Sequence, residues 1–490
     1  MIRRPPFLSI LSSLLLGELC AADWIGVPLR DSLSSVQPMT GIVYWTDSDK
    51  NSSDAVALEF SYMSFASVSP ADGVWNWKPV DSLLDAVASR KHQAILRFRY
   101  DYVGLPTTVP AWIQAKPGYQ ETVGKSEGED TWFSDWRSAD LQRFTLDFHK
   151  AFASRYQDDH RLAFVQMGFG LWAEYHIYDG PMILGRTFPD RAFQSRFIRL
   201  LDTTYTRLPW NISIDAANDW APFDTLPALK ALGFGLFDDS FMSQNHETEN
   251  RPNWLYFGET RWRSHPAGGE LSYYTTSDQQ HALDSAGMYG RTFDSQALRY
   301  GLSYMIGNDQ PQYHTATRIR QASMTCGYRF RAVAWEASND SFRLGISNVG
   351  AAPLYRDAWP VVGTDTSRTS LRELLPGDTA WFRFPRHSVT TTSVRPGIAC
   401  GHCVTGQRIG LEANLAGSSG VGAPSRSPKP VEARWGLGSW WYRSELPSLV
   451  RVIDVSGRIV WRGELPCTGK TWKPAPFSGM GLVVRPVADR

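Results

Sequence analysis

The stretch that decides the fold is Arg161–His176, RLAFVQMGFGLWAEYH. It begins as an apolar run suited to a buried strand. After two glycines it ends in a carboxylate, Glu174, and a histidine, His176. The segment before it, Ala139–Tyr156, carries apolar residues that share one face of a helical period: Leu141, Phe144, Phe148, Phe152 and Tyr156. The order of helix, strand and polar strand end indicates an α/β unit.

The same alternation continues on both sides of this unit. Eight β-rich apolar runs recur between residues 41 and 306: Gly41–Trp45, Val56–Phe65, His92–Tyr102, Arg161–Gly170, Asn211–Ala217, Ala231–Ser240, Gly268–Tyr274 and Leu298–Ile306. Amphipathic stretches such as Val80–Ser89 separate several of them. Eight such units over about 280 residues predict a (β/α)8 TIM barrel, whose typical length is about 250 residues. A doubly wound sheet is disfavoured, because no Gly-rich phosphate loop follows the first strand.

The composition is that of a large folded protein with a nearly neutral charge. A chain of 490 residues exceeds one ordinary domain. Its 50 basic and 49 acidic residues leave a net charge of +1, which argues against nucleic acid or an anionic membrane as the main partner. The 20 Trp residues predict either a large core or a site for flat apolar ligands such as sugar rings.

The first 22 residues predict a secretory signal peptide. They begin with Arg3 and Arg4, continue with an apolar stretch from Phe7 to Leu16, and end in small residues after Cys20. No later run of about 18 apolar residues indicates a membrane span. We therefore expect an exported protein that is secreted or lies at the cell surface.

Four further parts are expected after the signal peptide. The barrel occupies residues 23–326, and short strands without a helical period predict a β-sandwich over 327–398. A Gly/Ser/Pro-rich linker covers 399–432, and a small C-terminal β domain covers 433–490. The strands expected in the sandwich and the tail are Phe330–Ala337, Phe342–Asn348, Thr379–Phe384, a hairpin over Val450–Gly463 and a closing strand over Gly479–Arg485.

The cysteines predict a structural disulfide rather than a reactive site. Loss of Cys20 with the signal leaves four cysteines, which allow three connectivities in an oxidising compartment: Cys326, Cys400, Cys403 and Cys467. Cys400 and Cys403 follow Pro396 and Gly397 instead of opening a helix, which disfavours redox catalysis. One C-x-x-C pair is also too little for a zinc site. A local Cys400–Cys403 disulfide is therefore expected.

Two glutamates stand where a barrel carries its chemistry, at the C-terminal ends of strands and the loops after them. Glu174 follows the fourth predicted strand and Glu270 lies at the seventh, just after Gly268 and Gly269. Hydrolysis of a glycosidic bond needs one acid for the leaving oxygen and a second carboxylate that attacks the anomeric carbon or activates water. The pair predicts a glycoside hydrolase whose two glutamates face each other across the barrel mouth, with a polysaccharide or oligosaccharide as substrate.

Several motifs resemble known enzymes. The segment Pro70–Asp81 and the strand-four and strand-seven glutamates resemble clan A glycoside hydrolases, retaining enzymes with the acid/base on strand four and the nucleophile on strand seven. From Met39 to Pro311 the chain is also similar to a bacterial family of exported glycosidase-like proteins, known as a domain of unknown function. The motifs that carry this second resemblance are Leu96–Tyr100, Gly168–His176, Leu236–Ser240 and Gly268–Glu270.

The resemblance implies a role for each glutamate. Glu174 would be the general acid/base and Glu270 the nucleophile. Ala173 stands where clan members usually have an Asn, so no contact to a sugar 2-hydroxyl is carried over from this position. Glu174 must hold its proton near neutral pH, and we expect an apolar wall such as Trp172 to raise its pKa.

Glu270 must stay ionised, for which Arg97, Arg99 and Tyr273 are the candidate donors. Arg97 and Arg99 alternate along a strand and so point to the same side. If that side is the lumen, they could hold Glu270 or bind an anionic sugar; a buried ion pair below the site is the alternative.

Further candidate residues end other strands or lie near the same mouth. Asp238 and Asp239 are expected to contact substrate or to serve as an alternative acid, and Asp215 is a weaker third candidate. His246 is expected to be a solvated loop residue. The rings that could stack on sugars, or else pack in the core, are Tyr100, Trp172, Tyr175, His176 and Tyr273. No metal or cofactor is expected, because zinc-protease, serine-esterase and phosphate-loop patterns are missing from the sequence.

The tail resembles the C-terminal sorting domains of the type IX secretion system over roughly its last 40 residues, which implies secretion machinery as a partner. A small carbohydrate-binding or packing module is the alternative for the tail. For the whole chain, the rival to a hydrolase is a non-catalytic carbohydrate-binding or cell-surface protein on the same barrel.

Overall fold

The computed structural model describes residues 24–386 and 394–417, together with the C-terminal strands at 432–436, 439–443, 448–454, 459–465 and 480–486. The predicted signal peptide, residues 1–22, lies outside the described residues.

Eight parallel strands close into a barrel. They are β3 (Gly41–Trp45), β4 (Leu58–Ser64), β5 (Gln93–Arg99), β8 (Leu162–Met167), β9 (Trp210–Ser213), β10 (Gly235–Phe241), β11 (Ala267–Leu271) and β12 (Tyr304–Ile306). Their order around the ring is their order in the chain, and the pairing of Tyr304 with Gly41 closes it. Each of the eight predicted runs overlaps one of these strands, and β9, β10 and β11 each extend one residue beyond the predicted run. The predicted TIM barrel is confirmed.

Helices surround the barrel and follow the predicted amphipathic stretches. They are α1 (Phe65–Val68), α2 (Lys78–Ser89), α3 (Ala111–Gln114), α4 (Ala139–Tyr156), α5 (Arg191–Thr204), α6 (Asn250–Phe257), α7 (Thr276–His281), α8 (Phe293–Tyr300), α9 (Gln310–Tyr313) and α10 (Ala316–Thr325). Helix α4 begins where Ser138 accepts a hydrogen bond from the Leu141 N–H, and its predicted apolar face is buried. Between β9 and β10 the described chain has only the 3-10 turns Ile214–Ala216 and Pro227–Ala231; a third, Arg261–Arg263, precedes β11.

A β-sandwich follows the barrel, as predicted, but its strands come from more of the chain than expected. One sheet contains β1 (Ile25–Gly26), β2 (Leu29–Asp31), β13 (Phe330–Ala337), β14 (Ser341–Asn348), β17 (Thr379–Pro385) and β19 (Leu411–Leu415). The other contains β15 (Trp359–Val362), β16 (Asp365–Thr366) and β18 (Pro396–Ala399). β1 and β2 fall in the range expected for the barrel, and β19 in the expected linker. Short strands with distant partners leave no local periodicity that would reveal them.

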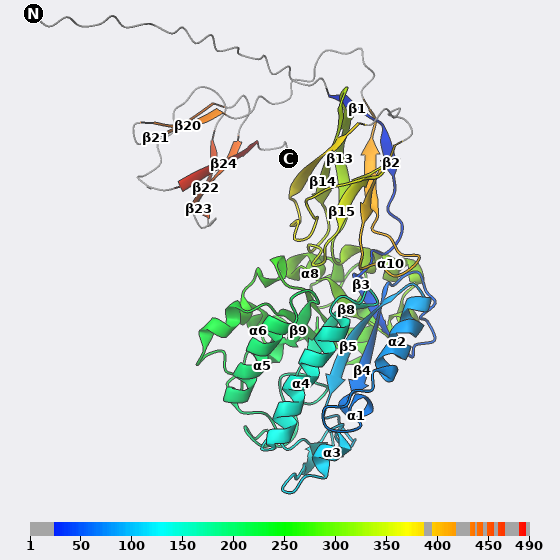
Figure 1. The fold of residues 1–490 in the computed structure, drawn as a ribbon, viewed down its shortest axis with the longest axis vertical. Coiled ribbons are helices and arrows are strands. Elements are labelled where there is room, and N and C mark those ends of the chain that lie inside the picture. Colours follow the sequence, from blue (N-terminus) through cyan, green and yellow to red (C-terminus); the bar gives the residue numbers. More distant parts are fainter. Residues whose placement is uncertain are drawn as a thin grey trace, which may run out of the picture. The chain divides into compact units, whose positions relative to one another are not determined.

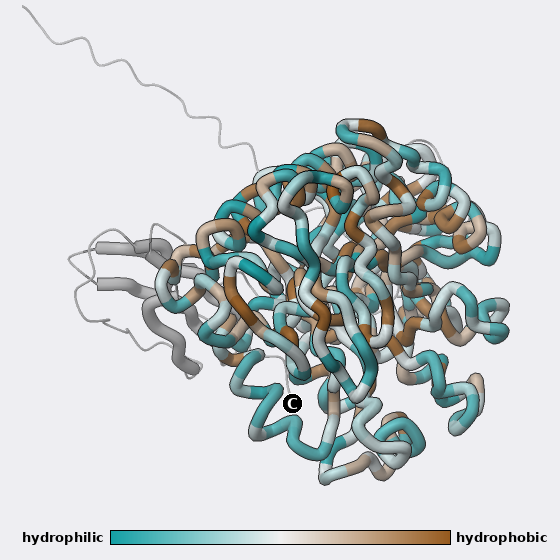
Figure 2. Tube along the Cα trace, turned by 90° about the horizontal axis from the view of Figure 1, so that it is seen from below, coloured by the Kyte–Doolittle hydropathy of each residue, from teal (hydrophilic) through white to brown (hydrophobic). Residues whose placement is uncertain are grey.

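The sandwich packs against the end of the barrel where the strands begin. The Arg356 guanidinium donates hydrogen bonds to the backbone oxygens of Gln157, Leu162 and Arg207, and the Gln93 amide donates to the backbone oxygen of His402. In Figure 1 the arrows of β4 and β5 point away from the sandwich. The C-terminal ends of the strands, here called the mouth, therefore lie at the opposite end, from which Figure 2 views the molecule.

The expected Cys400–Cys403 disulfide is wrong for this structure. Cys326, Cys400 and Cys403 are free thiols, with Cys326 buried. A hydrogen bond from the Cys403 thiol lowers the pKa of Cys400, and the His402 N–H also donates to the Cys400 sulfur over 3.4 Å. The C-x-x-C turn thus brings the two sulfurs together as a hydrogen-bonded pair of thiols. Cys467 lies outside the described residues.

The C-terminal residues from 419 form a separate compact unit. Its described strands are β20 (Glu432–Gly436), β21 (Ser439–Arg443), β22 (Ser448–Asp454), β23 (Ile459–Leu465) and β24 (Met480–Pro486). β22 and β23 pair as an antiparallel hairpin and β24 joins the other edge of β22, which confirms the predicted hairpin and closing strand. Among the described helices, none has the length and apolar character that crossing a membrane requires.

Candidate active site

A buried ion pair spans the barrel below the mouth. Arg97 on β5 points into the lumen and donates to both carboxylate oxygens of Asp239 on β10, over 2.5 Å to Oδ2 and 3.2 Å to Oδ1. Its Nε donates to Gln166 Oε1 on β8 over 2.7 Å, and the Gln166 amide donates to the Tyr304 hydroxyl on β12 over 2.8 Å. This polar chain joins four strands. The sequence left two alternatives for Arg97: a contact at the site with Glu270 or an anionic sugar, or a buried ion pair below the site. The structure shows the buried ion pair, and the partner of Arg97 is Asp239.

The loop after β8 turns Glu174 back toward the mouth. The N–H groups of Phe169 and Gly170 both donate to the backbone oxygen of Glu174, so the loop folds tightly onto itself. A Cβ at Gly170 would lie 1.8 Å from the backbone oxygen of His176, which leaves room only for glycine. Trp172 and Ala173 adopt left-handed backbone angles, with φ of 58° and 55°. Such strained non-glycine residues cluster at functional sites.

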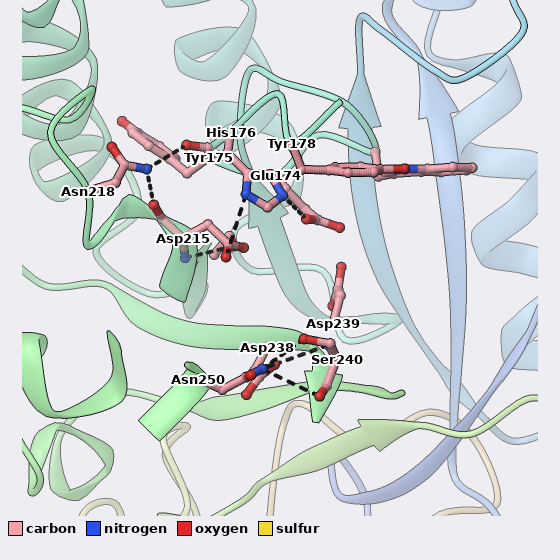
Figure 3. A network of polar contacts seen from close by, with 12 residues as sticks. Glu174, Tyr175, His176, Tyr178, Asp215, Asn218, Asp238, Asp239, Ser240 and Asn250 are labelled. Atoms are coloured by element: carbon pink, nitrogen blue, oxygen red, sulfur yellow. Dashed lines mark hydrogen bonds and ion pairs between the residues drawn. The ribbon is translucent and has the colours of Figure 1, made fainter. Parts of the chain in front are cut away.

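Glu174 belongs to a chain of three polar side chains (Figure 3). His176 Nε2 lies 2.9 Å from Glu174 Oε2, and His176 Nδ1 lies 3.7 Å from Asp215 Oδ1. Asp215 in turn accepts a hydrogen bond from the Ser213 hydroxyl. His176 and Asp215, both named by the sequence analysis, thus lie together beside Glu174.

The surroundings shift the pKa values of both partners upward. Burial raises the pKa of Glu174 to about 7, and the hydrogen bond from His176 partly opposes this shift. For His176, burial alone would lower the pKa, but the negative charge of Asp215 and the contact with Glu174 outweigh it and raise the pKa to about 9. Glu174 therefore keeps a proton into the neutral range, as a general acid must.

The same three residues are close enough to share a cation. The ligand atoms of Glu174, His176 and Asp215 all lie within 4.8 Å of one another. A nitrogen and two carboxylates suit a divalent transition metal. The contacts of His176 with Glu174 and with Asp215, however, explain the proximity of the three residues without a metal ion.

Glu270 on β11 is half-buried, in the crowded position that the two preceding glycines predicted. A Cβ at Gly268 would lie 2.3 Å from the Tyr304 ring, and one at Gly269 would lie 2.0 Å from the Asp238 backbone oxygen. The Oε1 atom of Glu270 is buried and has no hydrogen-bond partner among the described residues. One carboxyl oxygen at the mouth is thus left for a ligand to satisfy.

Burial raises the pKa of Glu270 well above its usual value. The negative charges of Asp239 and Glu174 add to this effect, while Arg97 and the Trp45 indole oppose it. Of the donors expected to keep Glu270 ionised, Arg97 binds Asp239 instead. Tyr273 does not donate to Glu270 Oε1, which has no hydrogen-bond partner among the described residues.

Aromatic side chains surround the carboxyl groups. The Trp172 indole N–H donates to the Tyr178 hydroxyl over 3.1 Å, and its ring lies 4.1 Å from the Tyr102 ring. Tyr273 and Tyr274 are 46% and 69% exposed, which leaves their rings available to a ligand. Trp172 and Tyr273 lie in the segments that follow the C-terminal ends of β8 and β11, and flat rings suit the C–H faces of sugars.

Four predicted positions are structural instead. Tyr100 is buried, stacks on Phe65 and bonds to Thr145; Tyr175 is buried against Phe169 and Phe188. Asp238 accepts hydrogen bonds from Asn250 and Trp254, and His246 contacts the Tyr300 hydroxyl and is fully buried instead of solvated. Neighbouring residues on a strand point to opposite faces. Arg99 therefore points inward and Tyr100 outward. In the same way, Asp239 points inward and Asp238 outward. Figure 3 shows this divergence of the two aspartates.

Several residues of the site were not among those predicted from the sequence: Trp45, Tyr62, Tyr102, Gln166 and Tyr178. Tyr62 is the most central of them. Its hydroxyl accepts a hydrogen bond from Arg97 over 3.3 Å, and after burial its pKa responds to Arg97, Asp239, Glu270 and Glu174. Trp45, Tyr62 and Tyr102 lie at or near the ends of the first three predicted strands. Their position at strand ends could have predicted that they belong to the site.

No protein-family model and no curated protein matches the chain. Among solved structures it is similar to the galactosidase domain of alpha-galactosidase-sucrose kinase, AgaSK, with 10% identity over 71% of this chain and 54% of that one, at a TM-score of 0.34. The chain thus spans about half the length of that structure. It is also similar to a GH5_18 protein from Streptomyces cattleya in complex with Manb1-4GlcNAc, with 13% identity, 55% and 70% coverage and a TM-score of 0.36.

A third similar structure is a GH5-4 broad specificity endoglucanase from an uncultured bacterium, with 11% identity, 59% and 85% coverage and a TM-score of 0.35. These neighbours are glycoside hydrolases with a TIM barrel. At such low similarity, the fold is defined by the closed order of the strands themselves. The chain is a (β/α)8 barrel protein with a polar site at its mouth, and any activity must be argued from that site.

The ion pair below the mouth makes a prediction about stability. The Arg97 and Asp239 side chains are 1% and 11% exposed, so Asp239→Asn leaves a guanidinium buried without its counter-charge. We expect the free energy of unfolding to fall by about 3–5 kcal/mol in urea denaturation followed by Trp fluorescence. As a control, Asp158→Asn removes a pair with Arg207 whose side chains are 60% and 54% exposed, and should cost below about 1 kcal/mol. Equal losses in the two variants would contradict this account.

Proposed function

We propose that the chain is an exported glycoside hydrolase that cleaves a polysaccharide or oligosaccharide by double displacement. The observation that carries the proposal is the presence at the mouth of two carboxyl groups with unlike surroundings, near enough that the charge of Glu174 raises the pKa of Glu270. Glu174 holds a proton into the neutral range, and Glu270 presents a buried oxygen without a partner. The exposed rings of Tyr273 and Tyr274 offer a stacking surface for the sugar.

Glu174 is proposed as the general acid/base. It is mostly buried, with a side chain that is 12% exposed, and its pKa of about 7 suits both donation and later acceptance of a proton near neutral pH. His176 fixes the orientation of the carboxyl group through the contact to Oε2. The other oxygen of Glu174 is then available to the glycosidic oxygen.

Glu270 is proposed as the nucleophile in preference to Asp239. Both oxygens of Asp239 accept hydrogen bonds from Arg97, so that carboxylate is committed to the ion pair. As the nucleophile, Glu270 acts in its ionised form. Arg97 and Trp45 favour its ionised form, and so does the positive charge that develops on the sugar in the transition state.

The reaction then has two steps. In the first, Glu270 forms a bond to the anomeric carbon while the bond to the leaving oxygen breaks, and Glu174 gives that oxygen its proton. In the second, Glu174 takes a proton from water, the water oxygen bonds to the anomeric carbon, and the bond to Glu270 breaks. The configuration at the anomeric carbon is retained after two displacements.

Export is proposed from the two ends of the chain. The first 22 residues have the pattern of a signal peptide, and the β22–β23–β24 sheet is compatible with the predicted sorting domain. Secretion machinery would then be the partner of the tail.

Substitution of the two glutamates separates their roles. On aryl glycosides with 4-nitrophenyl leaving groups, we expect Glu174→Gln to lower kcat/KM by about 10²–10⁴-fold. On 2,4-dinitrophenyl glycosides, whose leaving group needs no proton, Glu174→Gln should lower the rate of bond cleavage much less. Glu270→Gln should abolish cleavage of both. The exposed Glu247→Gln, whose carboxylate pairs with Arg299 of α8, is the matched control.

A set of glycosides spanning common sugar configurations is needed for this assay. Binding of oligosaccharides without cleavage of any member, together with binding unchanged in Glu174→Gln and Glu270→Gln, would favour the rival carbohydrate-binding protein. Equal losses for Glu174→Gln on both leaving groups would overturn the acid role.

The contact between His176 and Glu174 predicts a shift in pH dependence. Because Glu174 acts in its protonated form, activity should fall as the pH rises through its pKa of about 7. The hydrogen bond and charge of His176 lower that pKa, so His176→Phe should raise it and move the alkaline limb of the kcat/KM profile to higher pH. His281→Phe, at an exposed position paired with Asp284, should leave the limb in place. A shift to lower pH in His176→Phe would contradict the assignment.

A further inference from the structure

Arg99 is a second arginine at the mouth, and its surroundings differ from those of Arg97. It is the last residue of β5 and points to the same side as Arg97, two residues nearer the mouth. It is half-buried, and its guanidinium lies over the Tyr102 ring at 4.3 Å from the ring centre.

The positive charge of Arg99 has no counter-charge within the described part of the chain. No carboxylate oxygen of a described residue lies within 4.0 Å of it, in contrast to the bidentate partner of Arg97. Its Nη1 atom is buried and has no hydrogen-bond partner among the described residues. A buried donor without an acceptor is costly, and functional sites are where such groups occur.

Asp101, the neighbouring acid, does not form an ion pair with Arg99. Asp101 is fully buried, and its Oδ1 accepts hydrogen bonds from the N–H and the hydroxyl of Ser134. Burial raises the pKa of Asp101 well above its usual value, and its carboxylate does not form an ion pair with Arg99 among the described residues. Burial also lowers the pKa of Arg99 from its usual value, as expected for a cation that lacks a partner.

The other charges at the mouth compensate one another. Arg97 is paired with Asp239, and His176 lies between Asp215 and Glu174. Arg99 is thus a cation at the described mouth that a ligand can neutralise.

We propose that Arg99 binds an anionic substituent, a carboxylate or a sulfate, of the sugar that occupies the mouth. The inference rests on the proposed function, because it names the substrate class of the same site. A guanidinium matches either group with two parallel hydrogen bonds. Stacking on Tyr102 fixes the plane of the guanidinium and leaves its N–H edges for the anion.

Tyr102 also links Arg99 to the reacting centre. After burial, the pKa of the Tyr102 hydroxyl is lowered by Arg99 and raised by Glu270, so both groups act on the same ring. The Tyr102 ring contacts Trp172 as well, in the loop that carries Glu174. The anionic group is therefore placed on, or next to, the sugar whose bond is cleaved.

The test compares matched glycans. Each neutral oligosaccharide is paired with the same oligosaccharide oxidised to a carboxylate at C6 and with its 6-O-sulfate. Dissociation constants are measured by calorimetry on the full chain carrying Glu174→Gln, to prevent turnover. We expect tighter binding of one anionic form by about 10- to 100-fold, a preference that weakens as salt increases.

Substitution of Arg99 in the same background tests the cause of this preference. Arg99→Gln should lower the ratio of anionic to neutral affinity by about tenfold or more, and Arg99→Lys should keep part of it. Arg196→Gln removes a positive charge from the exposed outside of α5 and should leave the ratio unchanged. Thermal melting checks that the variants are folded. The carboxylate and sulfate arms show which anion is preferred.

The outcomes separate this inference from the proposed function. Equal affinity for neutral and anionic forms, or a ratio unchanged by Arg99→Gln in the folded variant, overturns the inference even if the wild-type protein cleaves glycosides. A preference that depends on Arg99, in a protein that cleaves none of the glycans, supports the inference and overturns the hydrolase.

Discussion

The site depends on one interaction, the buried ion pair between Arg97 and Asp239. Two charges removed from water stabilise a protein only when their geometry is good and their remaining donors are satisfied. Here the guanidinium is bidentate to Asp239 and also donates to Gln166, so β5, β8 and β10 are held together beneath the mouth. The pair occupies both oxygens of Asp239 and leaves Glu270 without a counter-ion of its own.

This arrangement sets the protonation of the other acids. Burial makes a negative charge on Glu270 unfavourable, and the negative charge of Asp239 adds to that cost. Glu174 is buried too, but its contact with His176 keeps its pKa near 7. The two glutamates therefore differ in their surroundings. The proposed reaction requires such a difference, because one carboxyl group must donate a proton while the other acts as an ionised nucleophile.

Much of the fold could be predicted from local patterns, because the barrel strands lie in β-rich runs of largely apolar residues and helix α4 shows a clear helical period. The position of Glu174 and Glu270 at strand ends could be predicted for the same reason. The partner of Arg97 could not, because Asp239 is 142 residues away and the pairing depends on barrel closure. Tyr100 was misassigned although strand alternation already placed it opposite Arg99. Strand β19 has too little sequence signal of its own to stand out from a Gly/Ser/Pro-rich stretch.

The most direct test of the central claim is to identify the residue that bonds to the sugar. The full chain is incubated with activated 2-deoxy-2-fluoro glycosides of several configurations, which slow the second step, and the labelled peptide is sequenced by mass spectrometry. The account predicts one sugar per chain, attached to Glu270, and no label in Glu270→Gln. A sugar attached to Asp239 would contradict it, because that carboxylate would then be free to react despite its pairing with Arg97.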